Sequence, residues 1–285
     1  MTEEISAAVH ACRSEIALLS ARLAELSARN TADHERALLA LRIVRDNDVL
    51  ARERLWTLRG SRAYEIAFEE DEPLVTIIIP TFSNWRLLRE RALPSVLGQT
   101  YARYECIVVG DDAPPEAAAA VGSFGDQRLR FVNLPYRGPY PSDPHDMHMV
   151  VGSTPFNTAL ALAAGRWIGS VGDDDALTPT YIETLLALAR AERAEVAYGQ
   201  IHHHIPDTSG EVLGAFPPQW GKWGIQCSLL HAGLRYLPLQ PTDWVFVIPN
   251  DMSLLQRMLR IGVRFAMRHE VVVDYYPSLL WKDRR

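Results

Sequence analysis

Three consecutive aspartates, Asp173, Asp174 and Asp175, directly follow an apolar stretch at 166–171. Like charges repel one another, and their burial is costly unless a positive charge compensates them. Adjacent carboxylates at the end of a buried strand therefore either point into water or hold a cation. Closely spaced anionic oxygens are the ligands that a hard divalent cation prefers. We therefore interpret the aspartate run as a cation site in preference to a solvated loop.

Polar residues also follow two other apolar stretches. Pro80 and Thr81 come after the stretch at 74–79, and Asp111 comes after the stretch at 104–109. In open α/β sheets, ligands bind beyond the carboxyl ends of parallel strands. If these stretches are parallel strands, their polar ends and the aspartate run face one crevice.

From residue 74 onward, apolar β-branched stretches alternate with stretches of helical spacing. Strands are expected at 74–79, 104–109, 129–134 and 166–171, with helices at 84–97, 154–165 and 178–192. The last two helices begin with Thr-Pro, a favourable cap and first-turn pair. This alternation predicts βαβ units and an α/β fold with a mostly parallel sheet flanked by helices.

Residues 1–70 are expected to be helical, because no proline precedes Pro73 and no glycine precedes Gly60. Apolar residues recur there at alternating spacings of four and three: Ile5, Val9, Cys12, Ile16, Leu19, Leu23 and Leu26. That is the spacing of a coiled-coil seam and predicts a homodimer through this helix. The alternative is a single amphipathic helix packed on its own domain. The chain is thus expected to consist of a helical, coiled-coil extension over 1–70 and a catalytic domain over 71–285.

Composition excludes several classes of protein. The net charge of −6 argues against nucleic acid as the main partner. Cys12, Cys106 and Cys227 are too few and too scattered for a disulfide framework or a zinc site. No apolar run is long enough to span a membrane, and charges near the N-terminus argue against a signal peptide. We expect a cytoplasmic protein that can act peripherally at a membrane surface.

The usual nucleotide-binding loops are absent from the sequence. No Walker-type glycine loop with its lysine is present, and no G-x-G-x-x-G follows a strand. The sequence therefore does not support a kinase, an ATPase or a dehydrogenase. Mg²⁺ or Mn²⁺ held by carboxylates keeps open positions for phosphate oxygens. A nucleotide-diphosphate substrate held through such a cation is the interpretation that remains.

Three segments, in this order, resemble family 2 glycosyltransferases of the GT-A fold. They are "PLVTIIIPTFSNWRLLRERALPSVLGQTYARYECIVVGDD", "NTALALAAGRWIGSVGDDDALTPTYIE" and "NDMSLLQRMLRIGVRFAMRHEVVVDYYPS". The resemblance covers roughly residues 73–278. It implies transfer of a sugar from a nucleotide-sugar donor to a glycan or glycoconjugate, with inversion at the anomeric carbon and with Mn²⁺ or Mg²⁺.

The resemblance also implies roles for particular residues. It implies nucleotide contacts for five positions: Pro80, Thr81, Asp111, Asn157 and Asp173. It implies that Asp174 is the metal ligand, supported by Asp175.

The chain departs from the family pattern at a few positions. Asp112 stands where the family often has glycine, and Gly172 stands where it often has an acid. Pro155 stands where it often has an arginine. The resemblance then leaves Arg137 or Arg166 to provide the missing phosphate contact.

Inversion by direct displacement needs a carboxylate that takes the proton from the acceptor hydroxyl. The candidates are Asp251 and Asp243. Asp243 precedes the strand-like run "WVFVI" and could be a structural cap, whereas Asp251 begins a predicted amphipathic helix that ends at Gly262. In the family an acidic pair begins that helix, and we favour Asp251 as the base. At a helix N-terminus its pKa is expected to stay low, because the helix dipole favours the charged form.

Two other patterns are less specific. His202, His203 and His204 are not expected to converge on a metal, because successive strand residues point to opposite faces. The segment at 216–234 is expected to recognise the acceptor, and its Trp220 and Trp223 could equally stack on sugar rings or pack in the core. The alternatives to a glycosyltransferase are a sugar nucleotidyltransferase and a non-catalytic coiled-coil scaffold with a degenerate transferase domain.

Overall fold

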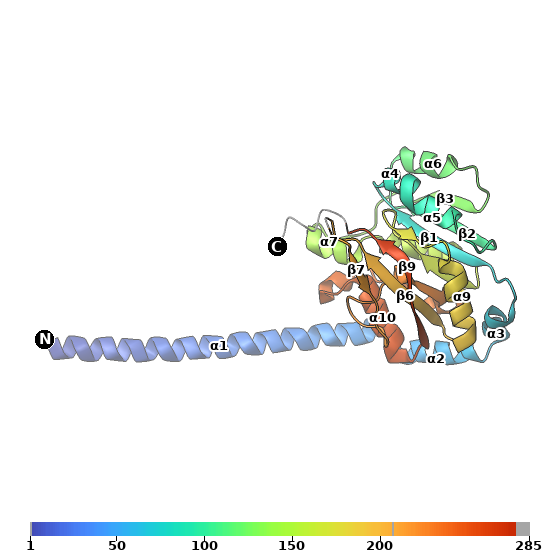
Figure 1. The fold of residues 1–285 in the computed structure, drawn as a ribbon. Coiled ribbons are helices and arrows are strands. Elements are labelled where there is room, and N and C mark those ends of the chain that lie inside the picture. Colours follow the sequence, from blue (N-terminus) through green and yellow to red (C-terminus); the bar gives the residue numbers. More distant parts are fainter. Residues whose placement is uncertain (1, 207, 278–285) are drawn as a thin grey trace. The chain divides into compact units, whose positions relative to one another are not determined.

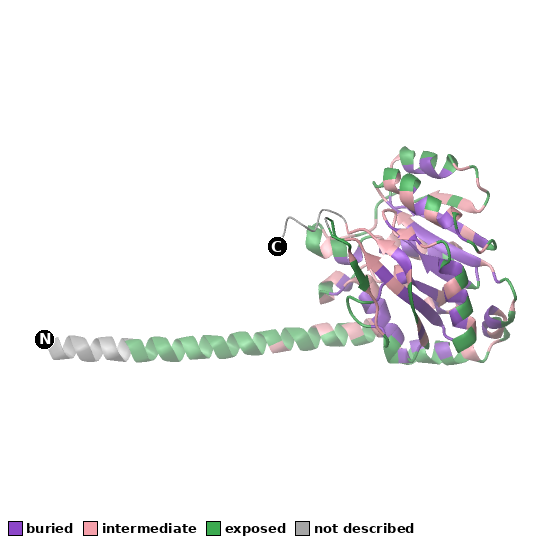
Figure 2. Ribbon diagram, in the orientation of Figure 1, coloured by how far each residue is buried: buried purple, intermediate pink, exposed green. Residues whose placement is uncertain are grey.

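The computed structural model describes residues 2–206 and 208–277, and the chain divides into two compact units at 1–47 and 48–285. The first unit is one continuous helix, α1 (Thr2–Asp46) (Figure 1). Its side chains are described from Arg13 onward, so those of Ile5, Val9 and Cys12 lie outside the described residues. The remaining residues of the predicted seam are exposed: Ile16, Leu19, Leu23 and Leu26 (Figure 2).

The second unit begins at Asp48, so two helices that the sequence analysis grouped with the extension pack with the rest of the chain. They are α2 (Asp48–Arg59) and α3 (Arg62–Glu69). Leu55 of α2 and Phe68 of α3 are buried in the core. The Tyr64 hydroxyl of α3 donates a hydrogen bond to Glu195 Oε1 at 2.8 Å. Because α2 and α3 pack on the sheet through these contacts, the second unit, called the sheet unit below, starts at Asp48 and not at the predicted residue 71.

Four parallel strands form the first half of the sheet, in the order β3-β2-β1-β4. They are β1 (Val75–Thr81), β2 (Tyr104–Gly110), β3 (Leu129–Asn133) and β4 (Trp167–Ser170). In the ladder, Thr81 lies beside Gly110, and Ile78 lies beside Ser170. The carboxyl ends of β1, β2 and β4 therefore lie at one edge, as the alternation of strands and helices predicted.

The second half of the sheet is mixed. Its strands are β5 (Ala176–Leu177), β6 (Val196–His203), β7 (Glu211–Leu213), β8 (Ser228–His231) and β9 (Phe265–Tyr275). β8 joins β4 to β6 through antiparallel pairing on both sides. β9 runs parallel to β6, and the short β5 pairs with β9 in antiparallel fashion. The segment of the aspartate run is thereby tied to the last strand of the chain.

Helices cover the sheet and carry several of the candidate residues. They are α4 (Trp85–Leu87), α5 (Leu93–Leu97), α6 (Pro115–Gly122), α7 (Pro144–Val150), α8 (Ser153–Leu162), α9 (Tyr181–Glu192) and α10 (Asn250–Ile261). The predicted helix at 84–97 contains a π-helical turn, η1 (Leu88–Ala92). α9 begins later than predicted because the Thr178 N–H donates to the carbonyl of Val272. α10 ends at Gly262, which adopts φ 85°, as predicted.

Three short 3₁₀ helices complete the unit: η2 (Ile225–Cys227), η3 (Ala232–Tyr236) and η4 (Asp243–Phe246). The run "WVFVI" that follows Asp243 is thus not a strand. The 3₁₀ turn ends where Val247 adopts φ 53°, which an extended strand does not allow. Among the described residues, no helix is both long enough and apolar enough to cross a bilayer.

Candidate functional site

The three polar strand ends meet through direct hydrogen bonds. The Thr81 hydroxyl donates to Asp173 Oδ2 at 2.8 Å, and Asn84 Nδ2 donates to Asp173 Oδ1 at 3.1 Å. The backbone N–H of Asp111 donates to the carbonyl of Thr81 at 2.8 Å. Pro80 lies in β1 beside β2, one residue before Thr81. The edge predicted from the sequence therefore exists, and Asp173 is held in place by Thr81 at the end of β1 and by Asn84, which precedes α4.

Asp111 lies deepest in this edge and is only 2% exposed. Its Oδ1 accepts a hydrogen bond from the Gly138 N–H at 2.8 Å, so the loop that contains Gly138 covers it. Its Oδ2 is buried and has no hydrogen bond of good geometry among the described residues, although the Tyr140 hydroxyl is close enough for Asp111 to raise the pKa of Tyr140. Because an unpaired buried acceptor is costly, this oxygen is suited to accept from an N–H of a ligand.

The aspartate run is a concentration of buried negative charge. Burial raises the pKa of Asp174 to about 6, and the charge of Asp173 adds to the effect. Burial, followed by the charge of Asp174, also raises the pKa of Asp175 well above its usual range. The Asp175 Oδ1 accepts a hydrogen bond from the Tyr276 N–H at 2.8 Å. A cation bound here would offset the unfavourable free energy of burying these ionised carboxylates close together, which is the cause of their raised pKa values.

One carboxylate oxygen of Asp174 and one of Asp175 lie close to Gly172. A Cβ added to Gly172 would lie 3.1 Å from Asp174 Oδ1 and 2.9 Å from Asp175 Oδ2, so both oxygens flank the space above this glycine. Asp173 already accepts two hydrogen bonds, and the three carboxylates do not converge as a trio in the described part of the chain. The available donors are thus two carboxylates, a set that suits a hard divalent cation with open positions.

Arg91 is a residue of this site that the sequence analysis missed. Its Nη1 donates to the backbone carbonyl of Asp174, and its guanidinium lies 3.7 Å from the ring centroid of Tyr276. It lies on the π-helical turn η1, an irregularity that often occurs at functional sites. The available signal was its spacing, which places an arginine among the apolar positions of the predicted helix.

The other candidates near the edge have different surroundings. The Asn157 side chain exchanges two hydrogen bonds with the Leu239 backbone, at 2.8 and 2.9 Å. It therefore ties α8 to the segment before η4. Arg137 lies at the carboxyl edge, with its guanidinium 3.9 Å from the ring centroid of Phe82. Arg166 precedes β4 at the opposite edge, where its N–H donates to the Leu74 carbonyl.

Asp251 occupies the first turn of α10 and is partly exposed. Its Oδ1 accepts a hydrogen bond from the Met252 N–H at 2.8 Å. Burial nevertheless raises the pKa of Asp251 to about 6. The expectation of a low pKa is therefore wrong, because the loss of hydration outweighs the hydrogen bonds at the helix N-terminus.

Asp243 is fully buried at the start of η4. Its Oδ1 accepts a hydrogen bond from the Ser253 hydroxyl of α10 at 2.9 Å. This contact joins η4 to α10 and agrees with the structural role considered for this residue.

Tyr275, at the end of β9, connects Asp251 to the aspartate run. Burial raises the pKa of Tyr275 to about 12, and the charges of Asp175, Asp174 and Asp251 add to the effect in that order. The charges of Asp251 and of the run therefore both contribute to the raised pKa of Tyr275, although these residues are far apart in sequence. Asp251 on α10 and the candidate cation site thus share Tyr275 as a neighbour.

The sequence of the chain is similar to those of known glycosyltransferases. Residues 153–271 match the model of glycosyl transferase family 2. The UDP-Glc:alpha-D-GlcNAc-diphosphoundecaprenol beta-1,3-glucosyltransferase WfgD of Escherichia coli is 28% identical over 196 residues, which are 67% of this chain and 71% of that protein. The putative colanic acid biosynthesis glycosyl transferase WcaA of Escherichia coli (strain K12) is 29% identical over 120 residues, 41% of this chain and 38% of that protein.

Solved structures show the same fold. Residues 1–349 of TarS from S. aureus, in complex with UDP, superpose with a TM-score of 0.56 at 15% identity over 72% of this chain and 60% of that one. This likeness confirms the predicted α/β fold of the GT-A type. The chain spans less than two thirds of the lengths of WcaA and of this TarS chain.

Proposed function

The chain belongs to glycosyltransferase family 2, and on this premise we propose that it transfers a sugar from a nucleotide-sugar donor to a glycan or glycoconjugate acceptor with inversion. The observation that supports this proposal most is the carboxyl edge of the sheet, where Thr81 and Asn84 donate hydrogen bonds to Asp173 of the aspartate run. A nucleotide sugar bound there would lie beyond the carboxyl ends of β1, β2 and β4, where ligands of open α/β sheets bind.

We propose a uridine diphosphate sugar as the donor. The relatives support this choice, since WfgD is named for UDP-Glc and TarS is solved with UDP. The unpartnered Asp111 Oδ2 supports it independently, because uracil offers an N–H that this oxygen can accept. Pro80, Thr81 and Asp173 then line the rest of the nucleoside pocket. Asn157 supports the pocket indirectly, through its bonds to Leu239.

Asp174 and Asp175 are proposed to hold Mn²⁺ or Mg²⁺, for which their oxygens around Gly172 are suited. When bound, the ion would neutralise charge that develops on the nucleoside diphosphate leaving group. Arg91 places a guanidinium beside the same run, and Arg137 places another at the carboxyl edge. Both are suited to phosphate oxygens, so Arg137 takes the role that the proline at 155 leaves vacant.

Asp251 is proposed as the general base. It takes the proton of the acceptor hydroxyl while that oxygen forms a bond to the anomeric carbon and the bond to the donor phosphate breaks. A pKa of about 6 suits this task, since the carboxylate is ionised at neutral pH yet more basic than an ordinary aspartate. Asp243 has no exposed surface and is proposed to support the position of α10.

The acceptor is proposed to be a lipid-linked sugar diphosphate, reached from the cytoplasmic side of a membrane. The support is the printed name of WfgD, whose acceptor carries a diphosphoundecaprenol group. Trp220, which is 58% exposed, is available to stack on an acceptor sugar, whereas Trp223 is buried and belongs to the core.

The test of this proposal compares Asp251→Asn with Asp243→Asn. Transfer from UDP-sugars to lipid-linked acceptors is measured, and donor binding is measured separately by calorimetry. Asp251→Asn should lower kcat by about 10²–10⁴-fold with donor affinity unchanged, because only proton transfer is lost. Asp243→Asn should keep kcat within a few fold. Loss of turnover in Asp243→Asn alone would contradict the assignment of the base, and absence of nucleotide binding by the native chain would favour a non-catalytic scaffold.

A further inference from the structure

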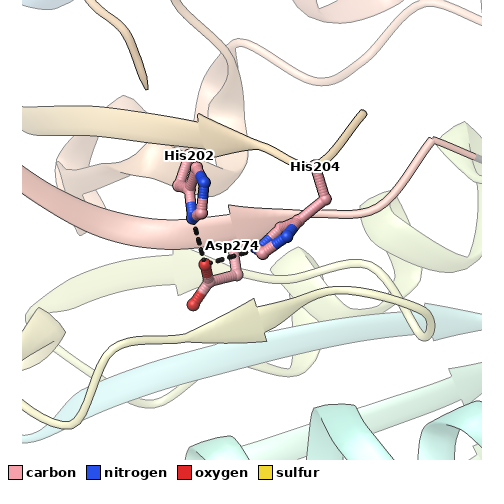
Figure 3. A group of neighbouring side chains, drawn as sticks. All are labelled: His202, His204 and Asp274. Carbon is pink, nitrogen blue, oxygen red and sulfur yellow. Dashed lines mark hydrogen bonds and ion pairs between the residues drawn. The ribbon is translucent and has the colours of Figure 1, made fainter. Parts of the chain in front are cut away.

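Two of the three consecutive histidines converge on a carboxylate outside the site described above. β6 and β9 run parallel, with His202 directly beside Asp274 in the ladder. His202 Nδ1 lies 3.0 Å from Asp274 Oδ1, and His204 Nε2 lies 2.7 Å from the same oxygen (Figure 3). Residues two apart in an extended segment share a face, so the outer histidines meet while His203 points away.

The hydrogen bonds of His202 indicate that a positive charge is missing between its ring and Asp274. His202 Nε2 lies 3.2 Å from the Ser209 carbonyl oxygen, which can only accept a hydrogen bond. Nε2 therefore carries a hydrogen, and in a neutral imidazole Nδ1 then presents a lone pair to Asp274. Two acceptors 3.0 Å apart require a positive charge between them, either a second proton on the ring or a metal ion.

The surroundings match those of a metal site. A backbone carbonyl that orients the far nitrogen is a common partner of metal-binding histidines, and Ser209 provides one. One donor atom from each of the three residues lies within 4.8 Å of the others, as three ligands of one ion require. The three side chains are about one third exposed, at 29%, 32% and 31%, so an ion can reach them from solvent.

We propose that His202, His204 and Asp274 bind a divalent transition-metal ion of the zinc type. Two imidazoles and one carboxylate suit Zn²⁺ better than the hard ions Mg²⁺ and Mn²⁺. Three protein ligands leave at least one position open for water or a ligand oxygen. The proposal is independent of glycosyl transfer, and it describes a site distinct from the Asp174–Asp175 pair.

The proposed ion would lie close to the aspartate run. Asp274 pairs with Ala176, the residue after Asp175. The His204 ring stacks on Tyr276 at 4.1 Å between centroids, and the Tyr276 N–H donates to Asp175. Tyr276 therefore contacts both His204 and Asp175, so a movement of His204 can displace Asp175 through this one residue.

The experiment uses the full untagged chain, stripped of metal with a chelator and dialysed into buffer with excess Mg²⁺ to fill oxygen-ligand sites. Zn²⁺ is titrated by calorimetry, and Co²⁺ is titrated by its visible absorption. One site per chain is expected. His202→Ala and His204→Ala should each weaken Zn²⁺ binding at least 100-fold, and Asp274→Asn at least 10-fold.

The matched control is His203→Ala, which removes the same side chain from the same strand but from its other face. It should bind Zn²⁺ like the native chain, and so should Asp174→Asn, which separates this site from the proposed donor site. If the native chain shows no Co²⁺ absorption and no heat of Zn²⁺ binding, the proposal is overturned, and a second proton on His202 provides the positive charge. Equal losses in His203→Ala and His202→Ala would also overturn it.

Discussion

At the scale of single residues, burial sets the protonation of the carboxylates in the site. Asp174 and Asp251 both have pKa values of about 6, and loss of hydration is the first cause for each. Their locations differ, since one lies in an acidic turn and the other at a helix N-terminus. Both carboxylates therefore change charge just below neutral pH, in the range that suits acid–base catalysis.

The pH dependence of turnover follows from Asp251. A general base must be ionised, so kcat should rise with pH through about 6 and level off above 7. The folded pKa lies above the ordinary value, so stability from this group is present at acid pH and lost as pH rises through about 6. Asp251→Asn should therefore unfold at the same or a higher temperature at pH 7. A rate that stays flat from pH 5 to 8 would argue against Asp251 as the base.

The second prediction at this scale concerns Asp174. Asp174→Asn should weaken Mn²⁺-dependent donor binding at least 10-fold while leaving binding without metal unchanged, because one of two anionic ligands is lost. The matched control is Asp112→Asn at the same edge, where Asp112 is exposed and has φ 58°, a conformation that asparagine tolerates. Calorimetry with and without EDTA checks both variants. Full activity of Asp174→Asn in excess chelator would remove the metal from the mechanism.

At the scale of elements, contacts between segments hold the site together. η4 and the segment before it carry no long helix or strand, so their position depends on side chains from α8 and α10. Asn157 of α8 supplies two bonds to the Leu239 backbone, and Ser253 of α10 supplies one to Asp243. These bonds place the start of α10, and with it Asp251.

Asn157→Ala should lower the free energy of unfolding by about 1–3 kcal/mol, because it leaves backbone groups of Leu239 without partners. Thr158→Ala is the control on the same helix, since the Thr158 hydroxyl donates within α8 to the carbonyl of Thr154, its one partner among the residues that the structure describes. Urea unfolding measures both. Unchanged stability of Asn157→Ala together with lost donor binding would instead support the direct donor contact that the family resemblance implies.

At the scale of the whole molecule, the chain has two units of different character. The sheet unit buries its apolar side chains, whereas α1 leaves Leu19, Leu23 and Leu26 more than half exposed. Exposed leucines at heptad spacing suit a parallel partner helix, and a second copy of the chain offers the same surface. Homodimerisation through α1 therefore stays a prediction.

Leu19→Glu combined with Leu23→Glu should convert such a dimer to a monomer, because charged residues at seam positions oppose pairing. Leu18→Glu combined with Ala21→Glu is the matched control, since both positions are exposed but lie outside the seam. Light scattering of the full chain over a range of concentrations gives the mass. A mass equal to one chain for the native protein, or an unaltered dimer in the seam variant, would leave the single-helix interpretation.

Local signals in the sequence by themselves determined the four parallel strands β1 to β4, several helices and the edge where the site lies, but not the strands of the mixed half of the sheet. β1 and β2 were predictable as continuous apolar runs because strands covered on both faces need them. The end of α10 at Gly262 was predictable because few other residues adopt its positive φ. The meeting of Thr81, Asp111 and Asp173 followed from the common edge of parallel strands.

Only the tertiary structure decided the properties that depend on neighbours distant in sequence. The pKa of Asp251 depends on burial by the whole unit, which outweighed the local helix effect. Arg91, on a π-helical turn, donates to the carbonyl of Asp174, which lies 83 residues further along the chain. His202 and His204 meet Asp274 because β9 inserts beside β6, and no sequence pattern encodes that pairing. Periodicity describes one segment at a time, whereas burial, charge and ligand geometry arise between segments.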